Sequence, residues 1–157
     1  MTNDTPPDGG EALRAAQRLD VFVPGRPAPQ GSKRHVGRGI LVESSKTVGT
    51  WRDDIRGTVL ATMATTGHTG FPSGTPVFAA LEFVLPRPTS TPKRRTPRAV
   101  KRPDLDKLAR AVLDALTSAG TWQDDSQVVG LVLTKRLAEV DETPGCRISL
   151  KEPEVTP

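Results

Sequence analysis

The chain has 157 residues, of which 35% are hydrophobic, 25% are charged and only 4% are aromatic, and its net charge is +4. This length fits one domain with an aliphatic core. No apolar run approaches the roughly 18 residues of a membrane-spanning helix, and the single cysteine, Cys146, excludes an intrachain disulfide. Because the N-terminal segment also has no apolar signal core, we expect a cytoplasmic protein without membrane contact.

The first half of the chain predicts an arm, two strands and a helix. Residues 1–17 are rich in Pro and Gly and poor in apolar residues, which is typical of a disordered arm. Alternation from Leu19 onward predicts a strand, and a short second strand is expected over 39–43. Residues 46–66 are expected to form a helix, because apolar side chains recur there at intervals of three and four, at Val48, Trp51, Ile55, Val59 and Met63.

The second half predicts three strands and the strongest helix of the chain. A strand is expected over 77–85, where Pro86 ends it, and further strands over 127–137 and 147–150. Residues 104–119 carry one continuous apolar stripe at helical spacing, and a glycine follows it.

Strands that alternate with two helices predict an α+β fold, with one mixed sheet packed by two main helices. We expect it to form a single domain over residues 18–151, followed by a flexible tail over 152–157.

Basic residues are concentrated in one segment. Residues 87–102 include seven Lys or Arg and no acid, whereas the chain from 139 onward has five acids and two bases. Such a block is typical of a surface that contacts a polyanion, although a solvated loop gives the same pattern. The candidate DNA-binding residues are Arg94, Arg95, Arg98, Lys101 and Arg102, with Lys33, Arg34 and Lys135 as weaker candidates. Aromatic side chains for base stacking are scarce here, so we expect contacts with the backbone.

Two pairs of aspartates flank the helix expected over 104–119. Asp104 and Asp106 open it, and Asp124 and Asp125 precede the next strand. Taken alone, the first pair suits a helix N-terminus and the second suits a turn. Positions two apart in a helix point about 200° apart, so Asp104 and Asp106 converge only if Asp104 is extended. Arg110 lies one turn beyond Asp106.

A meeting of these carboxylates would need a cation. At an effective dielectric of 20, two carboxylates 4 Å apart repel by about 4 kcal/mol. Mg²⁺ is the expected ion, with Mn²⁺ as an alternative, because hard cations bind carboxylates, water and phosphate. Such an ion activates water for attack on a phosphodiester, and Arg110 would neutralise charge on the phosphate. We expect products with a 5′-phosphate and a 3′-hydroxyl.

Several of these segments together resemble the RusA family of Holliday-junction resolvases. The family has an Asp-Leu-Asp-Asn that opens a helix, a Leu-Asp-Ala-Leu near its end and a later Asp-Asp before a strand. Here the matching residues are 102–116, 120–129 and Lys135, about a sixth of the chain. Residues 23–27, with Lys33 and Arg34, resemble the family's first strand and the basic turn after it.

The resemblance implies a magnesium-dependent homodimer that nicks four-way DNA junctions in recombination or repair. Asp104, Asp106 and Asp125 match the family's catalytic, metal-binding acids, and Asp124 matches their neighbour. Arg110 stands where the family has a functional lysine. Arginine is effectively never deprotonated, so it suits phosphate binding better than proton donation. A twofold dimer would present two equivalent sites to a twofold junction.

Three other interpretations stay open. A flap- or fork-specific nuclease would use the same acids on another branched DNA. A non-catalytic junction-binding protein would use them only to cap a helix. A generic basic α/β domain would use none of them. The resemblance implies a bacterial or phage-encoded protein without distinguishing the two.

Overall fold

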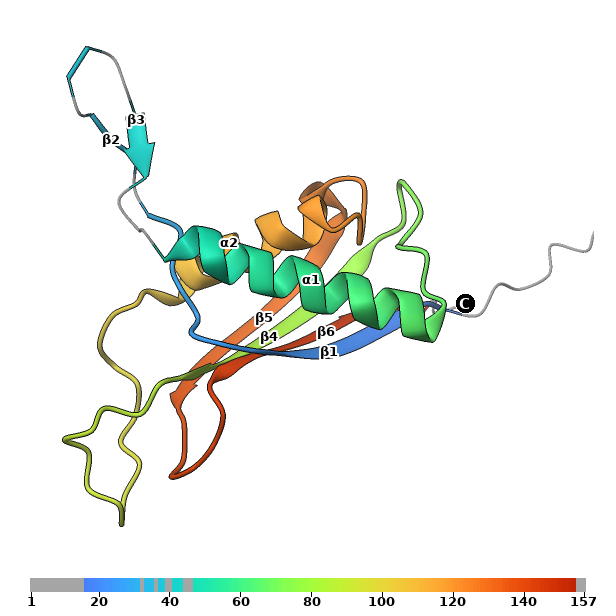
Figure 1. Cartoon of the computed structure of the whole chain (residues 1–157). Coiled ribbons are helices and arrows are strands. Elements are labelled where there is room, and N and C mark those ends of the chain that lie inside the picture. The colour runs from blue at the N-terminus through green and yellow to red at the C-terminus, as the bar shows by residue number, and fades with distance from the viewer. Residues whose placement is uncertain (1–15, 32, 36, 39–40, 44–46, 155–157) are drawn as a thin grey trace, which may run out of the picture.

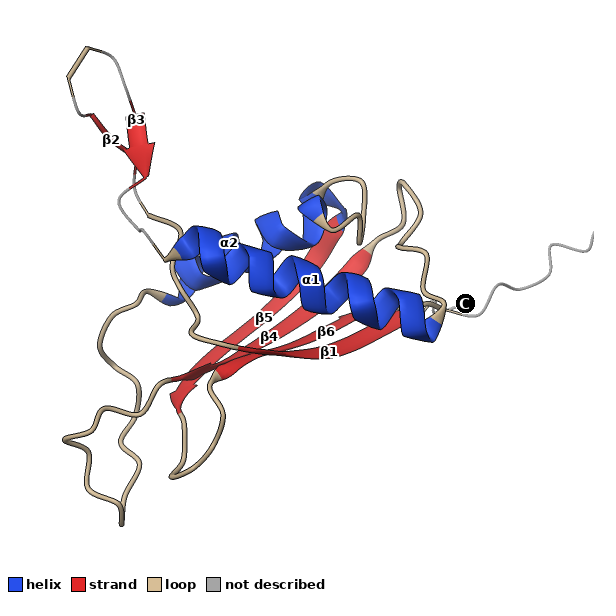
Figure 2. Cartoon of the chain, in the orientation of Figure 1, coloured by secondary structure: helices blue, strands red, loops and turns tan. Residues whose placement is uncertain are grey.

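A computed structural model describes residues 16–31, 33–35, 37–38, 41–43 and 47–154, which form one sheet with two helices on one face and a small separate hairpin (Figures 1 and 2). The elements in chain order are β1 (Arg18–Pro24), β2 (Lys33–His35), β3 (Leu41–Glu43), α1 (Val48–Thr66), β4 (Val77–Leu85), α2 (Leu105–Ser118), the 3-10 helix η1 (Asp125–Gln127), β5 (Val128–Leu137) and β6 (Gly145–Lys151).

The four-stranded sheet has the order β1-β6-β4-β5, and its strands are mixed in direction. β6 is antiparallel to both β1 and β4, whereas β4 and β5 are parallel. A parallel pair needs a crossover connection, which α2 provides. The chain therefore leaves the carboxyl end of β4, returns through α2 and enters β5 at its amino end. The start of α2 and the end of α2 consequently lie at opposite ends of the sheet (Figure 1).

The core lies between the sheet and the helices, as the apolar patterns predict. The stripe of α1 is buried, and so is one face of α2. Alternate residues of β1, β4 and β6 point to the same side and join one cluster, in which Trp51, Phe83 and Leu116 are almost fully buried. The α+β fold predicted from the sequence is thus confirmed, and the predicted strand over 77–85 matches β4.

The described structure differs from the prediction mainly around β2 and β3. One short strand was expected over 39–43; the structure has β3 there, paired antiparallel with β2. The arm over 1–17 falls almost wholly outside the described residues. No helix within the described ranges is long and apolar enough to cross a membrane.

Two glycines give a test of the packing. Gly57 lies on the exposed side of α1 with no atom within 4 Å of an added Cβ, whereas a Cβ on Gly145 would lie 2.2 Å from the carbonyl oxygen of Val23. Gly57→Ala should raise the free energy of unfolding by about 1 kcal/mol, since it removes a poor helix former. Gly145→Ala should lower it by about 1–3 kcal/mol, since the β1–β6 pair must separate. Urea unfolding of both variants checks this; a stable Gly145→Ala protein would contradict the register.

Candidate active site

The start of α2 carries two exposed carboxylates. Asp104 is the N-cap residue, and its φ of −72° and ψ of 139° are extended, as a convergence with Asp106 requires. Its side chain accepts no hydrogen bond from the helix N–H groups. The Asp104 carboxylate instead lies 3.6 Å from the ammonium of Lys107. Helix capping therefore does not account for Asp104, and its side chain is exposed.

Asp106 lies in the first turn of α2, and Arg110 lies four residues further on. Positions four apart in a helix share a face, so these two exposed side chains are neighbours on the surface of α2. A cation one turn from a carboxylate, at the positive end of a helix dipole, favours the binding of an anion such as a phosphate.

The second pair of aspartates lies at η1, just before β5. Asp124 caps this short helix, since its Oδ1 accepts a hydrogen bond from the Ser126 N–H at 2.8 Å. In return, the Asp124 N–H donates a hydrogen bond to Oε1 of Gln127. The hydrogen bonds from Ser126 hold the pKa of the Asp124 carboxyl below its ordinary value. Gln127 is itself fixed, because its amide donates to the carbonyls of Pro72 and Thr75. Asp124 therefore has a structural role, and Asp125 is the next residue; both side chains are exposed.

The two pairs do not form one pocket within a single chain, so that prediction is wrong. The 14 residues of α2, about 21 Å of helix, lie between them. Among the described residues, no three His, Cys, Asp or Glu side chains are placed to hold a common metal ion. The physical reason is the crossover: α2 starts at the carboxyl end of β4 and ends at the amino end of β5.

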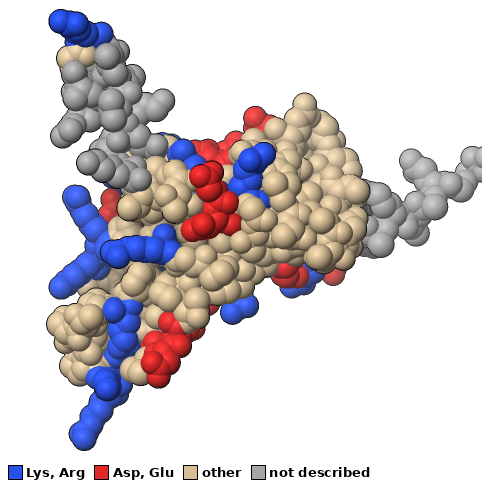
Figure 3. Space-filling model, in the orientation of Figure 1, with Lys and Arg blue, Asp and Glu red and all other residues tan. Residues whose placement is uncertain are grey.

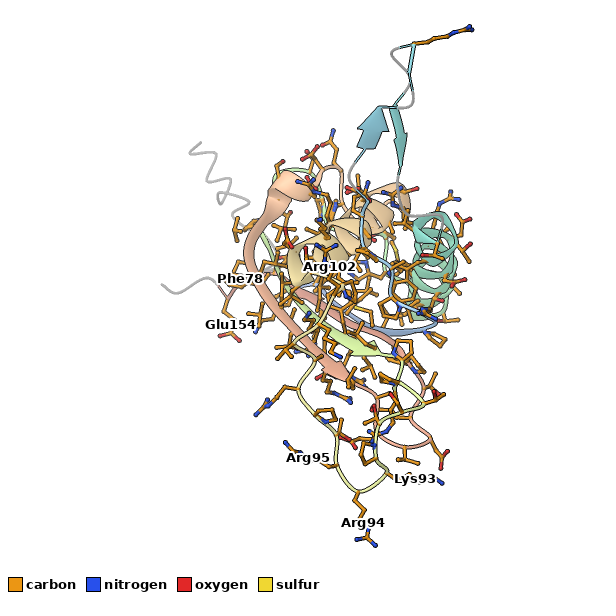
Figure 4. The ribbon with its side chains drawn as sticks, turned by 90° about the vertical axis from the view of Figure 1, so that its left-hand side faces the viewer. Phe78, Lys93, Arg94, Arg95, Arg102 and Glu154 are labelled. Atoms are coloured by element: carbon orange, nitrogen blue, oxygen red, sulfur yellow. The ribbon has the colours of Figure 1, made fainter. Side chains whose placement is uncertain are left out.

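The basic segment between β4 and α2 is a structured loop at the carboxyl end of β4. Its organiser is Arg87, whose guanidinium donates to Thr96 Oγ1 at 2.7 Å and to three carbonyl oxygens, those of Pro92, Arg95 and Ala138. Lys93, Arg94 and Arg95 extend from the tip of this loop (Figure 4). Other Lys and Arg side chains gather on the same side of the molecule (Figure 3). The sequence could not distinguish Arg87 from the other loop cations.

Lys135 donates hydrogen bonds to the backbone at the end of the basic loop, a contact that the sequence did not indicate. Near the end of β5, its ammonium donates to the carbonyl oxygens of Lys101 and Pro103 at 2.9 and 2.8 Å. It thus fixes the backbone immediately before Asp104. Lys135 is a positioning residue in the structure, whereas its predicted contact with DNA remains a prediction. Lys33 and Arg34 lie in β2, and their side chains fall outside the described part of the structure.

Comparison with protein families shows the class of protein to which this chain belongs. A family model described as "Endodeoxyribonuclease RusA" matches residues 24–151, which is most of the chain. The chain therefore belongs to the RusA family of endodeoxyribonucleases. The match runs from the last residue of β1 to the last residue of β6, so it includes both aspartate pairs and the basic loop.

Individual relatives match over a shorter stretch. Proteins named "Crossover junction endodeoxyribonuclease RusA" from Escherichia coli K12 and from Escherichia coli O1:K1 / APEC are each 46% identical to this chain over 50 residues. A protein named "Crossover junction endodeoxyribonuclease rusA" from Enterobacteria phage 82 matches to the same extent. The aligned stretch covers 32% of this chain and 38% of the length of these relatives.

Arg87 can be tested against a loop cation that extends into solvent. Arg87→Gln and Arg94→Gln each remove one positive charge from the same loop. Loss of the Arg87 hydrogen bonds should speed amide exchange at Thr91 and Arg95 by about tenfold or more, since a hydrogen bond to a charged group contributes about 1.5–3 kcal/mol. Arg94→Gln should leave these rates within about twofold. Hydrogen–deuterium exchange by NMR measures both; equal exchange in the two variants would remove Arg87 from the role of organiser.

Proposed function

We propose that this chain is a magnesium-dependent endodeoxyribonuclease that resolves four-way DNA junctions by paired symmetric nicks, in recombination or repair. The observation that carries the proposal is the position of Asp104 and Asp106. They stand at the start of α2, beside the basic loop, at the carboxyl end of the parallel strands β4 and β5. This end of parallel strands is where α/β sheets commonly bind their ligands. Family membership and the names of the relatives support the same activity.

The carboxylates at the start of α2 have the chemistry that Mg²⁺ requires. Mg²⁺ commonly binds through one or two carboxylates and takes its other ligands from water and substrate phosphate. Asp104 and Asp106 are exposed, and Asp104 makes no capping bond that an ion would have to displace. When bound, Mg²⁺ or Mn²⁺ lowers the pKa of a water molecule and neutralises charge on a phosphodiester oxygen. Arg110 then binds the scissile phosphate, and cleavage leaves a 5′-phosphate and a 3′-hydroxyl.

A second copy of the chain supplies the remaining acid. β5 is an edge strand, and Val129, Leu131 and Val132 on it are 61%, 41% and 64% exposed. An apolar strand with an unpaired edge favours pairing with another chain. A twofold homodimer formed by antiparallel β5 strands is an isologous contact, in which the same surface serves both copies.

This pairing resolves the separation of the aspartates. In antiparallel β5 strands, the start of β5 in one copy lies opposite the end of β5 in the other. Asp125 precedes that start, and Lys135 near that end holds the segment before Asp104. Asp125 of one copy therefore joins Asp104 and Asp106 of the other. Asp124 positions Asp125 and keeps its second oxygen, Oδ2, for the ion.

The dimer then has two equivalent sites, as two matched nicks require. Cations of the basic loop, Arg94, Arg95, Arg98, Lys101 and Arg102, contact the phosphates around each site. Lys33 and Arg34 of the β2–β3 hairpin extend this contact. With DNA as the substrate, the protein acts in the cytoplasm of a bacterial cell, whether the host or a phage encodes it.

The acids are tested with a synthetic mobile four-way junction, in Mg²⁺ and in chelator. Asp106→Asn and Asp125→Asn should each slow nicking by about a hundredfold or more, because a group that neutralises transition-state charge is lost. Asp114→Asn is the matched control, since Asp114 is an exposed acid of α2 at 3.6 Å from Arg52. It should nick within about threefold of the parent.

Three outcomes would contradict the proposal. An Asp106→Asn protein as fast as the parent would remove the site from α2. Tight junction binding without nicks in any divalent ion would favour a binding protein, and equal cleavage of flaps or forks would favour a broader nuclease.

The proposed dimer interface is tested by a substitution on the exposed edge of β5. Val132→Lys places two like charges close to the twofold axis and blocks an apolar strand edge, so it should shift the protein from dimer to monomer. Leu60→Lys is the control, since Leu60 is 42% exposed on α1, away from β5. Sedimentation velocity measures the oligomeric state of both variants, and circular dichroism checks that both are folded. A dimeric Val132→Lys protein would exclude the β5 interface.

A further inference from the structure

A cavity of about 490 Å³ lies between the basic loop and the carboxyl ends of β4 and β5. Leu85 and Leu137, at these two strand ends, form part of its wall with Val100 and several prolines. Four cations also line it, Arg26, Arg98, Lys101 and Arg102, and none of the described residues that line it is acidic. The four cations are exposed, whereas Leu85 is buried and Leu137 is partly buried, so the cations form a positively charged rim beside a partly apolar wall, directly before Asp104.

Three sets of hydrogen bonds hold the backbone around the cavity. The Val100 N–H donates to the carbonyl oxygen of Arg98 at 3.0 Å, which folds the chain into a tight turn. Lys135 holds the carbonyls of Lys101 and Pro103. The strand ends are joined as well, since the Ala138 N–H donates to the Leu85 carbonyl at 2.8 Å. A loop fixed in this way presents a preformed cavity.

We propose that this cavity binds one unpaired nucleotide of the DNA substrate, with the base inside and its phosphate at the rim. The volume is within the range of about 300–1,000 Å³ that is typical of small-molecule sites, which are mostly apolar with a few polar groups. The rim cations complement a phosphate. The guanidinium of Arg102 offers a plane for stacking, which nucleic-acid-binding proteins use where aromatic side chains are absent.

This inference rests on the proposed function, because the nucleotide must come from DNA held at Asp104 and Asp106. Arg102 and Pro103 line the cavity and immediately precede Asp104, so an occupied cavity lies next to the cleavage site. A base leaves its stack most readily where pairing is already broken. The branch point is such a place. The cavity therefore selects branched over plain duplex DNA and adds base contact to the backbone contacts expected from the sequence.

The cavity is tested by titrating the full chain with the dinucleotide d(TpT) and with an analogue that lacks one base. NMR signals of the Val100 and Leu137 methyl groups report the binding of each compound. The parent should bind d(TpT) about tenfold or more tightly than the analogue, since stacking of one base contributes about 1–3 kcal/mol. Ala99→Trp fills the cavity and should abolish this preference. Thr89→Trp places the same indole at an exposed residue of the same loop outside the cavity and should keep the preference for the base.

A second variant tests the cavity without adding a large side chain that could disturb the fold. Arg102→Gln removes one rim cation from an exposed position and should weaken d(TpT) binding by about threefold or more. No base preference in the parent, unchanged binding by Ala99→Trp, or equal loss in Thr89→Trp would each overturn the inference. The titration uses neither metal nor junction. Nicking without base preference would therefore refute the cavity alone, and base binding without nicking would refute the nuclease alone.

Discussion

The parallel direction of β4 and β5 determines where the two pairs of aspartates and the basic loop lie. Two parallel neighbours cannot be joined by a tight turn, so the connection must cross the length of the sheet, and α2 makes that crossing. The basic loop, Asp104 and the end of β5 are brought together at one end of the sheet. Asp124 and Asp125 are carried to the other. The hydrogen bonds of Lys135 to the segment before Asp104 fix this arrangement.

In the proposed enzyme, each end of the sheet supplies only part of the active site. The end at the start of α2 has two carboxylates, a neighbouring Arg110 and the cations of the basic loop. The end at η1 has Asp125, which the helix cap of Asp124 holds in place. Between them runs an apolar edge strand with Val132 on its surface. In the proposed homodimer, a twofold partner on this edge would bring the two ends together. Under this proposal catalysis would depend on dimerisation, and the two sites of the dimer would make the two nicks.

Local patterns in the sequence predicted the elements well, because an apolar stripe such as that of residues 104–119 directly reflects which face is buried. The extended conformation of Asp104 followed from its place before the helix. Alternation along β5 carries no information about the direction of its partner, but the helix between β4 and β5 is typical of a strand–helix–strand unit with parallel strands. The prediction that the four aspartates share one pocket failed because the 14 residues of α2, about 21 Å of helix, lie between the two pairs. The roles of Arg87 and Lys135 depend on contacts between distant residues, as does the cavity beside Arg102, and no local pattern encodes them.

The shared site is tested most directly by mixing two inactive variants. When Asp106→Asn and Asp125→Asn proteins are unfolded together and refolded, each mixed dimer has one site with both substitutions and one site with neither. Nicking of a four-way junction should reappear, at about one quarter of the parent's site concentration if chains pair at random, and mainly as single nicks. If Asp106 and Asp125 serve one site within a single chain, every site in the mixture carries a substitution. A mixture as inactive as its components would therefore contradict the account.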